Sequence, residues 1–261
     1  MVSSFTITSI IISLLITIGT PIALFIIFRK RFQISIPVLL IGAATFFIFA
    51  QMLEGIAHNF ILFNNGTMRG WAENPWLYML YAGLMAGIFE ETGRFVVMKY
   101  ALKTSRQWKD GLSFGLGHGG AEAIVLVGLN SIIMLVFAFM INSGSFDALF
   151  TDNQMKDALT PIKEQLTGDS GGLILLGGIE RLAAMSIQLG LSILVMYAIV
   201  SKQMKYFIFA ILIHAVIDFP VALYQVKVIE NIYVLEALIV VFAVGAIVWI
   251  AKSRKLFVHE K

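Results

Sequence analysis

Residues 10–28 read IIISLLITIGTPIALFIIF, and residues 233–251 read YVLEALIVVFAVGAIVWIA. Each stretch is long enough to cross the roughly 30 Å hydrocarbon layer of a bilayer as a helix. Neither shows the in-and-out alternation over about ten residues that marks a strand of an outer-membrane barrel. Hydrophobic residues make up 59% of the 261 residues and charged residues 13%, against about 25% charged in a soluble domain. The sequence therefore predicts an all-α, polytopic membrane helix bundle.

Apolar runs separated by polar breaks predict about seven transmembrane helices in a single integral membrane domain, residues 1–261. Lys and Arg accumulate on the cytoplasmic side of membrane proteins, so their positions predict orientation. With seven spans, most basic clusters fall on the same side of the membrane. If this side is the cytoplasmic one, the N-terminus lies outside and the C-terminus inside. These clusters are Arg29–Arg31, Lys99–Lys109, Lys202 with Lys205, and Lys252–Lys255. The expected spans are 5–28, 34–63, 76–99, 111–141, 171–200, 206–226 and 232–250.

The longest break, residues 142–170, is expected to be an ordinary solvated loop. Its apolar residues would also allow a short amphipathic helix lying on the membrane. They are Phe146, Phe150, Leu159, Ile162 and Leu166.

Composition also limits the chemistry. The basic clusters punctuate apolar spans, as topology determinants do, so we expect no binding of nucleic acid. The chain has no cysteine, which excludes disulfides and thiolate metal sites. Any bound metal would have to use histidine nitrogens and carboxylate oxygens. We expect a multi-pass protein of the cell membrane.

Ionisable residues lie inside the expected spans, where a charge costs about 2.5–3.5 kcal/mol on insertion scales. Three of the four histidines lie there, each with a carboxylate four residues away and hence on the same helix face. At about 1.5 Å rise per residue, Glu90, His118 and His214 lie at one depth, about 11–14 Å from the cytoplasmic ends. We expect the reaction centre at this level. Glu54 with His58, and Glu180 with Arg181, form a separate outer group that we interpret as structural.

A carboxylate and two imidazoles at one depth can activate water for hydrolysis and stabilise an oxyanion. The same residue types can bind a divalent metal such as zinc with an open position for water. From the residues alone, both versions stay open. A proton- or metal-ion-coupled transporter is the alternative function, because ion pathways also need intramembrane acidic and histidine residues.

Three motifs carry a resemblance to a known family. Residues 90–94 read EETGR, residues 114–118 read FGLGH and residues 214–218 read HAVID, which are the patterns EExxR, FxxxH and HxxxD. In this order, on separate spans, they resemble the motifs of the CAAX-protease and bacteriocin-processing clan of intramembrane endopeptidases. Within the clan the chain most resembles the YhfC family of membrane peptidases, and PrsW-type proteases share a similar pattern. The resemblance covers about residues 76–218, the expected catalytic core.

The resemblance implies catalytic roles for four residues. Glu90 would activate water with the help of His118, and His214 and Asp218 would stabilise the oxyanion or position the substrate. Many clan members have three residues between the glutamate pair and the arginine, whereas this chain has two. The choice between Glu90 and Glu91 as the base therefore stays open.

Four further residues are expected to support the site. The resemblance implies that Glu91 and Arg94 form an ion pair. Phe114, the first residue of the FxxxH pattern, is expected to pack beside the site. Glu122 lies one helical turn beyond His118 and would orient its imidazole. We expect an intramembrane endopeptidase that uses no covalent intermediate and no assigned metal, and that cleaves nearer the cytoplasmic leaflet. Its substrates would be membrane proteins or lipidated peptides that enter laterally from the bilayer.

Overall fold

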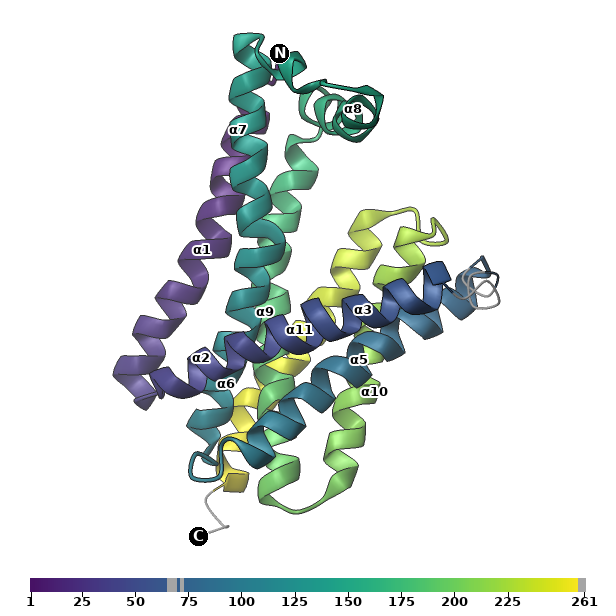
Figure 1. The fold of residues 1–261 in the computed structure, drawn as a ribbon. Coiled ribbons are helices and arrows are strands. Elements are labelled where there is room, and N and C mark those ends of the chain that lie inside the picture. Colours follow the sequence, from purple (N-terminus) through teal and green to yellow (C-terminus); the bar gives the residue numbers. More distant parts are fainter. Residues whose placement is uncertain (65–69, 71–72, 258–261) are drawn as a thin grey trace. The chain divides into compact units, whose positions relative to one another are not determined.

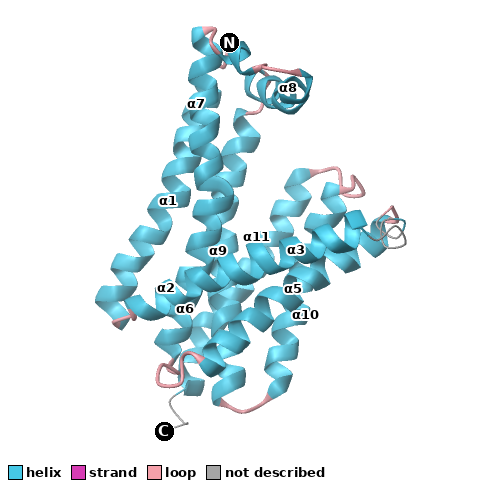
Figure 2. Cartoon of the chain, viewed as in Figure 1, coloured by secondary structure: helices cyan, strands magenta, loops and turns pink. Residues whose placement is uncertain are grey.

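The structure is a computed structural model that describes residues 1–64, 70 and 73–257. Helices are the regular elements of these residues, and none of them forms a strand (Figure 2). The all-α prediction is therefore confirmed. The chain forms two compact units, Met1–Leu24 with Glu122–Leu182, and Phe25–Ala121 with Ala183–Lys261. We call them the first and the second unit, and the expectation of a single domain stays a prediction.

Each expected span coincides with one helix or with one continuous helical run. Among the described residues, six runs have the length and composition to cross a membrane, which supports the polytopic prediction. They are α1 (Ser4–Phe32); α2 (Ile36–Thr45) with η1 (Phe46–Glu54), α3 (Gly55–His58) and η2 (Asn59–Asn64); α6 (Trp108–Ala123) with η3 (Ile124–Gly128) and α7 (Leu129–Ser143); α9 (Gly171–Val200); α10 (Met204–Gln225); and α11 (Ile232–Ser253), which η5 (Arg254–Phe257) follows.

The seventh expected span is α5 (Pro75–Tyr100), which has 26 residues. At 1.5 Å per residue it is about 39 Å long, enough to cross the bilayer. Its composition differs from that of the other six because it carries Glu90, Glu91 and Arg94 in its middle. The count of seven spans and the orientation stay predictions.

In the first unit, α1 and α7 run antiparallel (Figure 1). The Val2 amide at the start of α1 donates to Asn142 Oδ1 near the end of α7 at 2.7 Å. Ile10 and Ala138 are fully buried between these helices. The first part of α9 also packs on α1, and a Cβ at Gly178 would lie 2.4 Å from Ser13 Oγ. Small residues thus let these helices approach closely.

The expectation of a loop at residues 142–170 is wrong, and a helix, which the sequence also allowed, is present there. This segment contains the short 3₁₀ turn η4 (Phe146–Leu149) and the helix α8 (Asn153–Thr167). The Asp152 side chain caps α8 by accepting the Met155 amide at 2.8 Å. Leu159 and Leu166 are buried, so burial of the apolar face stabilises a helix here.

In the second unit, α5 and α10 pack together along most of their length (Figure 1). A Cβ at Gly83 would lie 2.6 Å from the carbonyl oxygen of Ala215, and one at Gly87 would lie 2.6 Å from that of Ile211. Only glycine permits this approach of two backbones. It holds the charged middle of α5 against α10.

Glycines of α6 also let that helix approach α2 and α9 closely. A Cβ at Gly117 would lie 1.8 Å from the Leu39 carbonyl oxygen, and one at Gly119 would lie 2.8 Å from Gln188 Cβ. His118 lies between these two glycines and is fully buried. The glycine-rich sequence of α6 therefore serves close packing around His118.

Candidate active site

The middle of α5 places three charged side chains inside the second unit. Glu90 is 8% exposed, and Glu91 and Arg94 are 0% exposed. Arg94 follows the two glutamates by four and three residues, so a helix brings all three side chains to one face. Charges this deeply buried are stable only when they are paired and hydrogen-bonded.

Arg94 supplies this pairing. Its Nη1 donates to Glu91 Oε1 at 2.5 Å, and its Nη2 donates to Glu90 Oε2 at 3.1 Å. Nη2 also donates to Oε1 of Gln188 on α9. The predicted ion pair of Glu91 with Arg94 is present, and Arg94 holds Glu90 as well. The two glutamates are therefore fixed by one guanidinium.

Each glutamate also accepts a hydrogen bond from an imidazole of another helix. His118 Nε2 on α6 donates to Glu90 Oε2 at 2.9 Å, and His214 Nδ1 on α10 donates to Glu91 Oε1 at 2.7 Å. The second nitrogen of His214 lies 3.5 Å from Asp218 Oδ2. This is an ion-pair distance, looser than a good hydrogen bond.

The structure thus joins six of the residues predicted from sequence into one chain of contacts across α5, α6 and α10. In order, the chain of contacts runs through His118, Glu90, Arg94, Glu91, His214 and Asp218. We call it the charged cluster. The catalytic roles of these residues stay predictions.

Aromatic rings enclose the imidazole of His118. Phe114, one turn earlier on α6, is stacked on it with ring centroids 6.5 Å apart, and Phe46 of η1 meets it edge-on at 5.5 Å. The predicted place of Phe114 beside the site is therefore observed. His118 Nδ1 is buried without a hydrogen-bond partner among the described residues. The imidazole is thus held through Nε2 alone.

Glu122 lies in the first unit, where it accepts a hydrogen bond from Arg181 Nη1 at 3.3 Å. Arg181 Nη2 donates to Glu180. The structural interpretation of Glu180 and Arg181 agrees with this ion-paired arrangement. The expected role of Glu122 in orienting His118 stays a prediction.

Two contacts were not assigned to the site from sequence. Gln188 is 6% exposed and contacts the guanidinium of Arg94, and Phe46 contacts His118. A lone amide inside an apolar span is a detectable signal, because such a group needs a partner in the membrane. Phe46 gave no signal, since phenylalanine is ordinary in a spanning helix.

A polar cavity of about 340 Å³ opens beside Asp218. We call it the vestibule. It lies where α5 begins and α10 ends, and its walls include Glu54, His58, Tyr81 and Gln225. His58 donates through Nε2 to Glu54 Oε1 at 3.1 Å, and its Nδ1 accepts from the Tyr81 hydroxyl at 2.7 Å. The predicted pair of Glu54 and His58 is thus part of a hydrogen-bonded wall.

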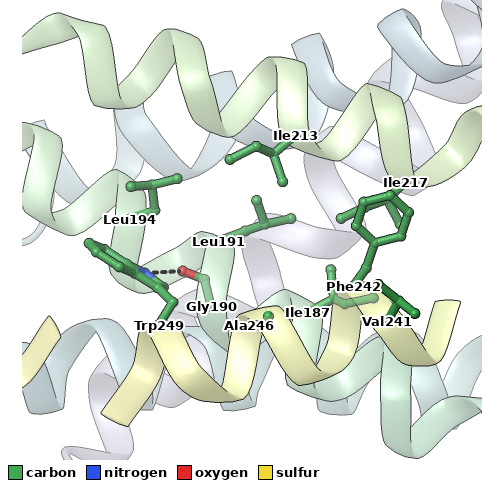
Figure 3. A pocket seen from close by; sticks show the side chains of 11 residues that line it. Ile187, Gly190, Leu191, Leu194, Ile213, Ile217, Val241, Phe242, Ala246 and Trp249 are labelled. Atoms are coloured by element: carbon green, nitrogen blue, oxygen red, sulfur yellow. Dashed lines mark hydrogen bonds between the residues drawn. The ribbon is translucent and has the colours of Figure 1, made fainter. Parts of the chain in front are cut away.

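A second cavity, of about 400 Å³, lies between α9, α10 and α11 and is lined by apolar side chains (Figure 3). Ile213 and Ile217 face it, each next in sequence to a cluster residue of α10. The Trp249 indole N–H in its wall donates to the Gly190 carbonyl at 3.2 Å. Among its lining residues that the structure describes, none therefore offers a free polar side chain for catalysis.

Comparison with known proteins identifies the family. The model of the YhfC intramembrane metalloprotease family matches residues 12–240. The chain belongs to this family. It is also 43% identical to the uncharacterized membrane protein YhfC of Bacillus subtilis (strain 168) over 237 residues. These aligned residues cover 91% of the chain and 92% of that relative. No solved structure matches the chain.

Membership of the YhfC family confirms the resemblance drawn from the three motifs. It supports a multi-pass membrane protein and, in general terms, an intramembrane protease. The wider relationship to the CAAX-protease and bacteriocin-processing clan stays a prediction.

The name of the YhfC family implies a metal, so we compared the cluster with a metal site. Its two imidazoles and three carboxylates are the ligand types that zinc uses. Their arrangement does not fit, because each imidazole is bonded to a different glutamate and Arg94 contacts both glutamates. Among residues 1–64, 70 and 73–257, no three histidine or acidic residues are grouped to hold a metal ion. We therefore derive no reaction step through a metal.

Proposed function

We propose that this chain is an intramembrane endopeptidase in which Glu90 activates water for attack on a peptide bond. The observation that carries the proposal is the shared oxygen of Glu90. Its Oε2 accepts hydrogen bonds from both His118 and Arg94, so the carboxylate is fixed in a buried, polar cluster assembled from three helices. A base held in this way is preorganised for proton transfer.

The proposed reaction needs no covalent intermediate. Because both contacts of Glu90 fall on Oε2, Oε1 is the oxygen that accepts the proton of water. The hydroxide oxygen bonds to the carbonyl carbon, and the C–N bond then breaks as Glu90 returns the proton to the leaving nitrogen. The carbonyl carbon thus gains the hydroxyl group of water and the nitrogen gains the remaining proton, so atoms and charges balance.

His214 is the proposed donor to the developing oxyanion. Its Nδ1 is bonded to Glu91 at 2.7 Å, which fixes the ring, whereas its Nε2 lies 3.5 Å from Asp218. In this proposal both ring nitrogens carry a proton, so His214 is an imidazolium, and the looser second contact leaves its Nε2–H available to a negatively charged oxygen. Such donors are worth most in a water-poor site, where the dielectric is low. Asp218 would keep the imidazole oriented.

Water has to reach this cluster through protein, because the bilayer core excludes it. Asp218 is the most accessible member of the cluster, with 31% of its side chain exposed, and it lines the vestibule. A polar cavity of about 340 Å³ is large enough to hold water. We propose that the vestibule supplies the hydrolytic water.

The test is cleavage of a co-expressed single-span substrate. Glu90→Gln and His118→Gln should lower the cleavage rate about 10²–10⁴-fold, the usual loss for a general acid or base, while the protein still accumulates. Glu180→Gln is the matched control, because it neutralises another intramembrane glutamate outside the cluster, and it should cleave normally. Full activity of Glu90→Gln together with loss in Glu91→Gln would make Glu91 the base.

Metal content is measured separately on the purified wild-type protein. We expect less than one equivalent of any transition metal, and cleavage that survives chelation. One bound zinc per chain, with activity lost on chelation and restored by zinc, would overturn the metal-free mechanism but not the protease assignment.

Transport is the second candidate, and one observation favours it. Ionisable side chains follow one another from Glu54 and His58 in the vestibule wall to Asp218 and the charged cluster, as a proton pathway requires. Ion or proton flux in proteoliposomes that is lost in Glu90→Gln, without any cleavage by the wild type, would favour transport.

A further inference from the structure

A third cavity of the second unit, of about 600 Å³, is lined by four basic side chains. We call it the basic cavity. Its cations come from three separate segments: Arg31 from the end of α1, Arg106 and Lys109 from the start of α6 and the turn before it, and Arg254 after α11. No acidic side chain is among the lining residues that the structure describes. Four like charges therefore face one space.

The contacts of Arg254 and Arg106 hold these two side chains in place without neutralising them. The guanidinium of Arg254 lies 5.7 Å from the ring centroids of both Phe32 and Trp108. Arg106 Nη2 donates to the Lys99 carbonyl at 2.8 Å, and its Nε is buried without a partner among the described residues. Cation–π contacts and carbonyl acceptors orient a cation but leave its charge in place.

The nearest carboxylate in sequence offsets only part of this charge. Asp110 Oδ2 accepts the Gln107 amide at 2.9 Å at the start of α6 and interacts electrostatically with Lys109, but Asp110 does not line the cavity. The three arginines and Lys109 therefore share the cavity with no acidic side chain among its described lining residues, and an anion from outside would relieve the repulsion among them.

The place of the basic cavity narrows the choice of anion. It lies where α1 and α9 end, where α6 begins and beyond the end of α11, which is the level of the lipid headgroups for helices that cross a bilayer. The positive-inside rule requires basic residues on this side of the membrane. It does not require those of three segments to converge on one cavity.

We propose that the basic cavity binds the phosphate group of an anionic membrane lipid. Arginine matches phosphate through paired N–H donors, and lysine adds a point charge. Basic cavities between transmembrane helices at the membrane surface recognise anionic headgroups in this way. This site is separate from the charged cluster and does not depend on the proposed peptidase activity.

The experiment measures retention of lipids by the full-length protein, purified in detergent, by native mass spectrometry. Phosphatidylglycerol, phosphatidylcholine and inorganic phosphate are titrated separately. Wild type should retain phosphatidylglycerol in preference to phosphatidylcholine. Lys109→Gln and Arg254→Gln should each weaken this binding about fivefold, from about 1 kcal/mol per basic residue at the membrane surface.

Matched controls remove a neighbouring charge that does not line the cavity. Lys103→Gln and Lys255→Gln should retain phosphatidylglycerol as wild type does, and Lys109→Arg should keep the binding because it keeps the charge. Equal binding by Lys109→Gln and Lys103→Gln would overturn the proposal. Displacement of the lipid by millimolar inorganic phosphate, or an equal preference for phosphatidylcholine, would overturn an anionic lipid as the ligand. The unfolding midpoint without lipid shows that each variant is folded.

Discussion

Replacing Arg94 by glutamine should be among the most destabilising single substitutions in the second unit. The guanidinium is fully buried and donates to Glu90, Glu91 and Gln188. Its loss leaves two carboxylates inside the protein without their cation. Breaking a buried ion pair by removing one partner costs about 3–5 kcal/mol.

This loss of stability can be measured as a shift in the unfolding temperature. For a chain of this size 1 kcal/mol corresponds to about 2–4 °C, so Arg94→Gln should unfold about 6–20 °C below wild type. The assay is thermal unfolding in detergent, followed by near-ultraviolet circular dichroism. Lys163→Gln is the control, because it removes an ion pair with Asp147 that is 2.5 Å long but 35% and 59% exposed. Such surface pairs contribute about 0–1 kcal/mol.

A second substitution tests the cause. Adding Glu91→Gln to Arg94→Gln removes one of the stranded carboxylates, so the double variant should recover about 0.5–3 kcal/mol relative to the sum of the single effects. If Arg94→Gln shifts the midpoint no more than Lys163→Gln does, Arg94 does not stabilise the buried glutamates. If the effects of Arg94→Gln and Glu91→Gln simply add, the stranded carboxylates are not the cause of the loss.

Three more outcomes follow from the fold and the vestibule. Gly117→Ala should lower the unfolding midpoint and the amount of folded protein, because the added Cβ would lie 1.8 Å from a backbone oxygen. Gly177→Ala is the control, because a Cβ there would lie in open space, and this substitution should leave stability unchanged or raise it slightly. Ala82 lines the vestibule, so a cysteine at this position should react with a water-soluble maleimide, and the labelled protein should lose cleavage activity. Leu80 lies on the same helix and is 42% exposed, and Leu80→Cys should stay unlabelled in the bilayer. Labelling of Leu80→Cys but not of Ala82→Cys would show that the vestibule holds no water. Asp152→Ala should destabilise α8 by about 0.5–2 kcal/mol through the lost cap, and unchanged protease sensitivity of α8 would contradict this.

Much of the fold could be predicted because the bilayer restricts what a chain can do. Apolar runs such as residues 10–28 have to be helices when lipid offers no hydrogen bonds, and the helices of the structure follow the expected spans closely. The segment 142–170 was predicted less well, since whether Leu159 and Leu166 are buried depends on a surface that the other helices create. Gly83 and Gly87 permit the close packing of α5 on α10, but their positions in the sequence do not show which helix they contact.

The sequence predicted which residues belong to the candidate site, but only some of the contacts between them. Common depth and the three motifs indicated Glu90, His118 and His214. The pairing of Glu90 with His118 and of Glu91 with His214 depends on how α6 and α10 are rotated against α5, which helical spacing along one chain does not fix. For the same reason Gln188 and Phe46 were not assigned to the site.

From the amino-acid sequence alone we could predict that the chain crosses the membrane repeatedly and carries charged residues at one level within it. Both follow from local properties, the apolar character of each segment and the rise of a helix per residue. The packed helices are needed to see which charges meet. They show that Arg94 bridges both glutamates and that four basic residues of separate segments share one cavity. Side-chain contacts between helices arise from the rotation and close approach of whole helices, and these depend on all of the packed surfaces together.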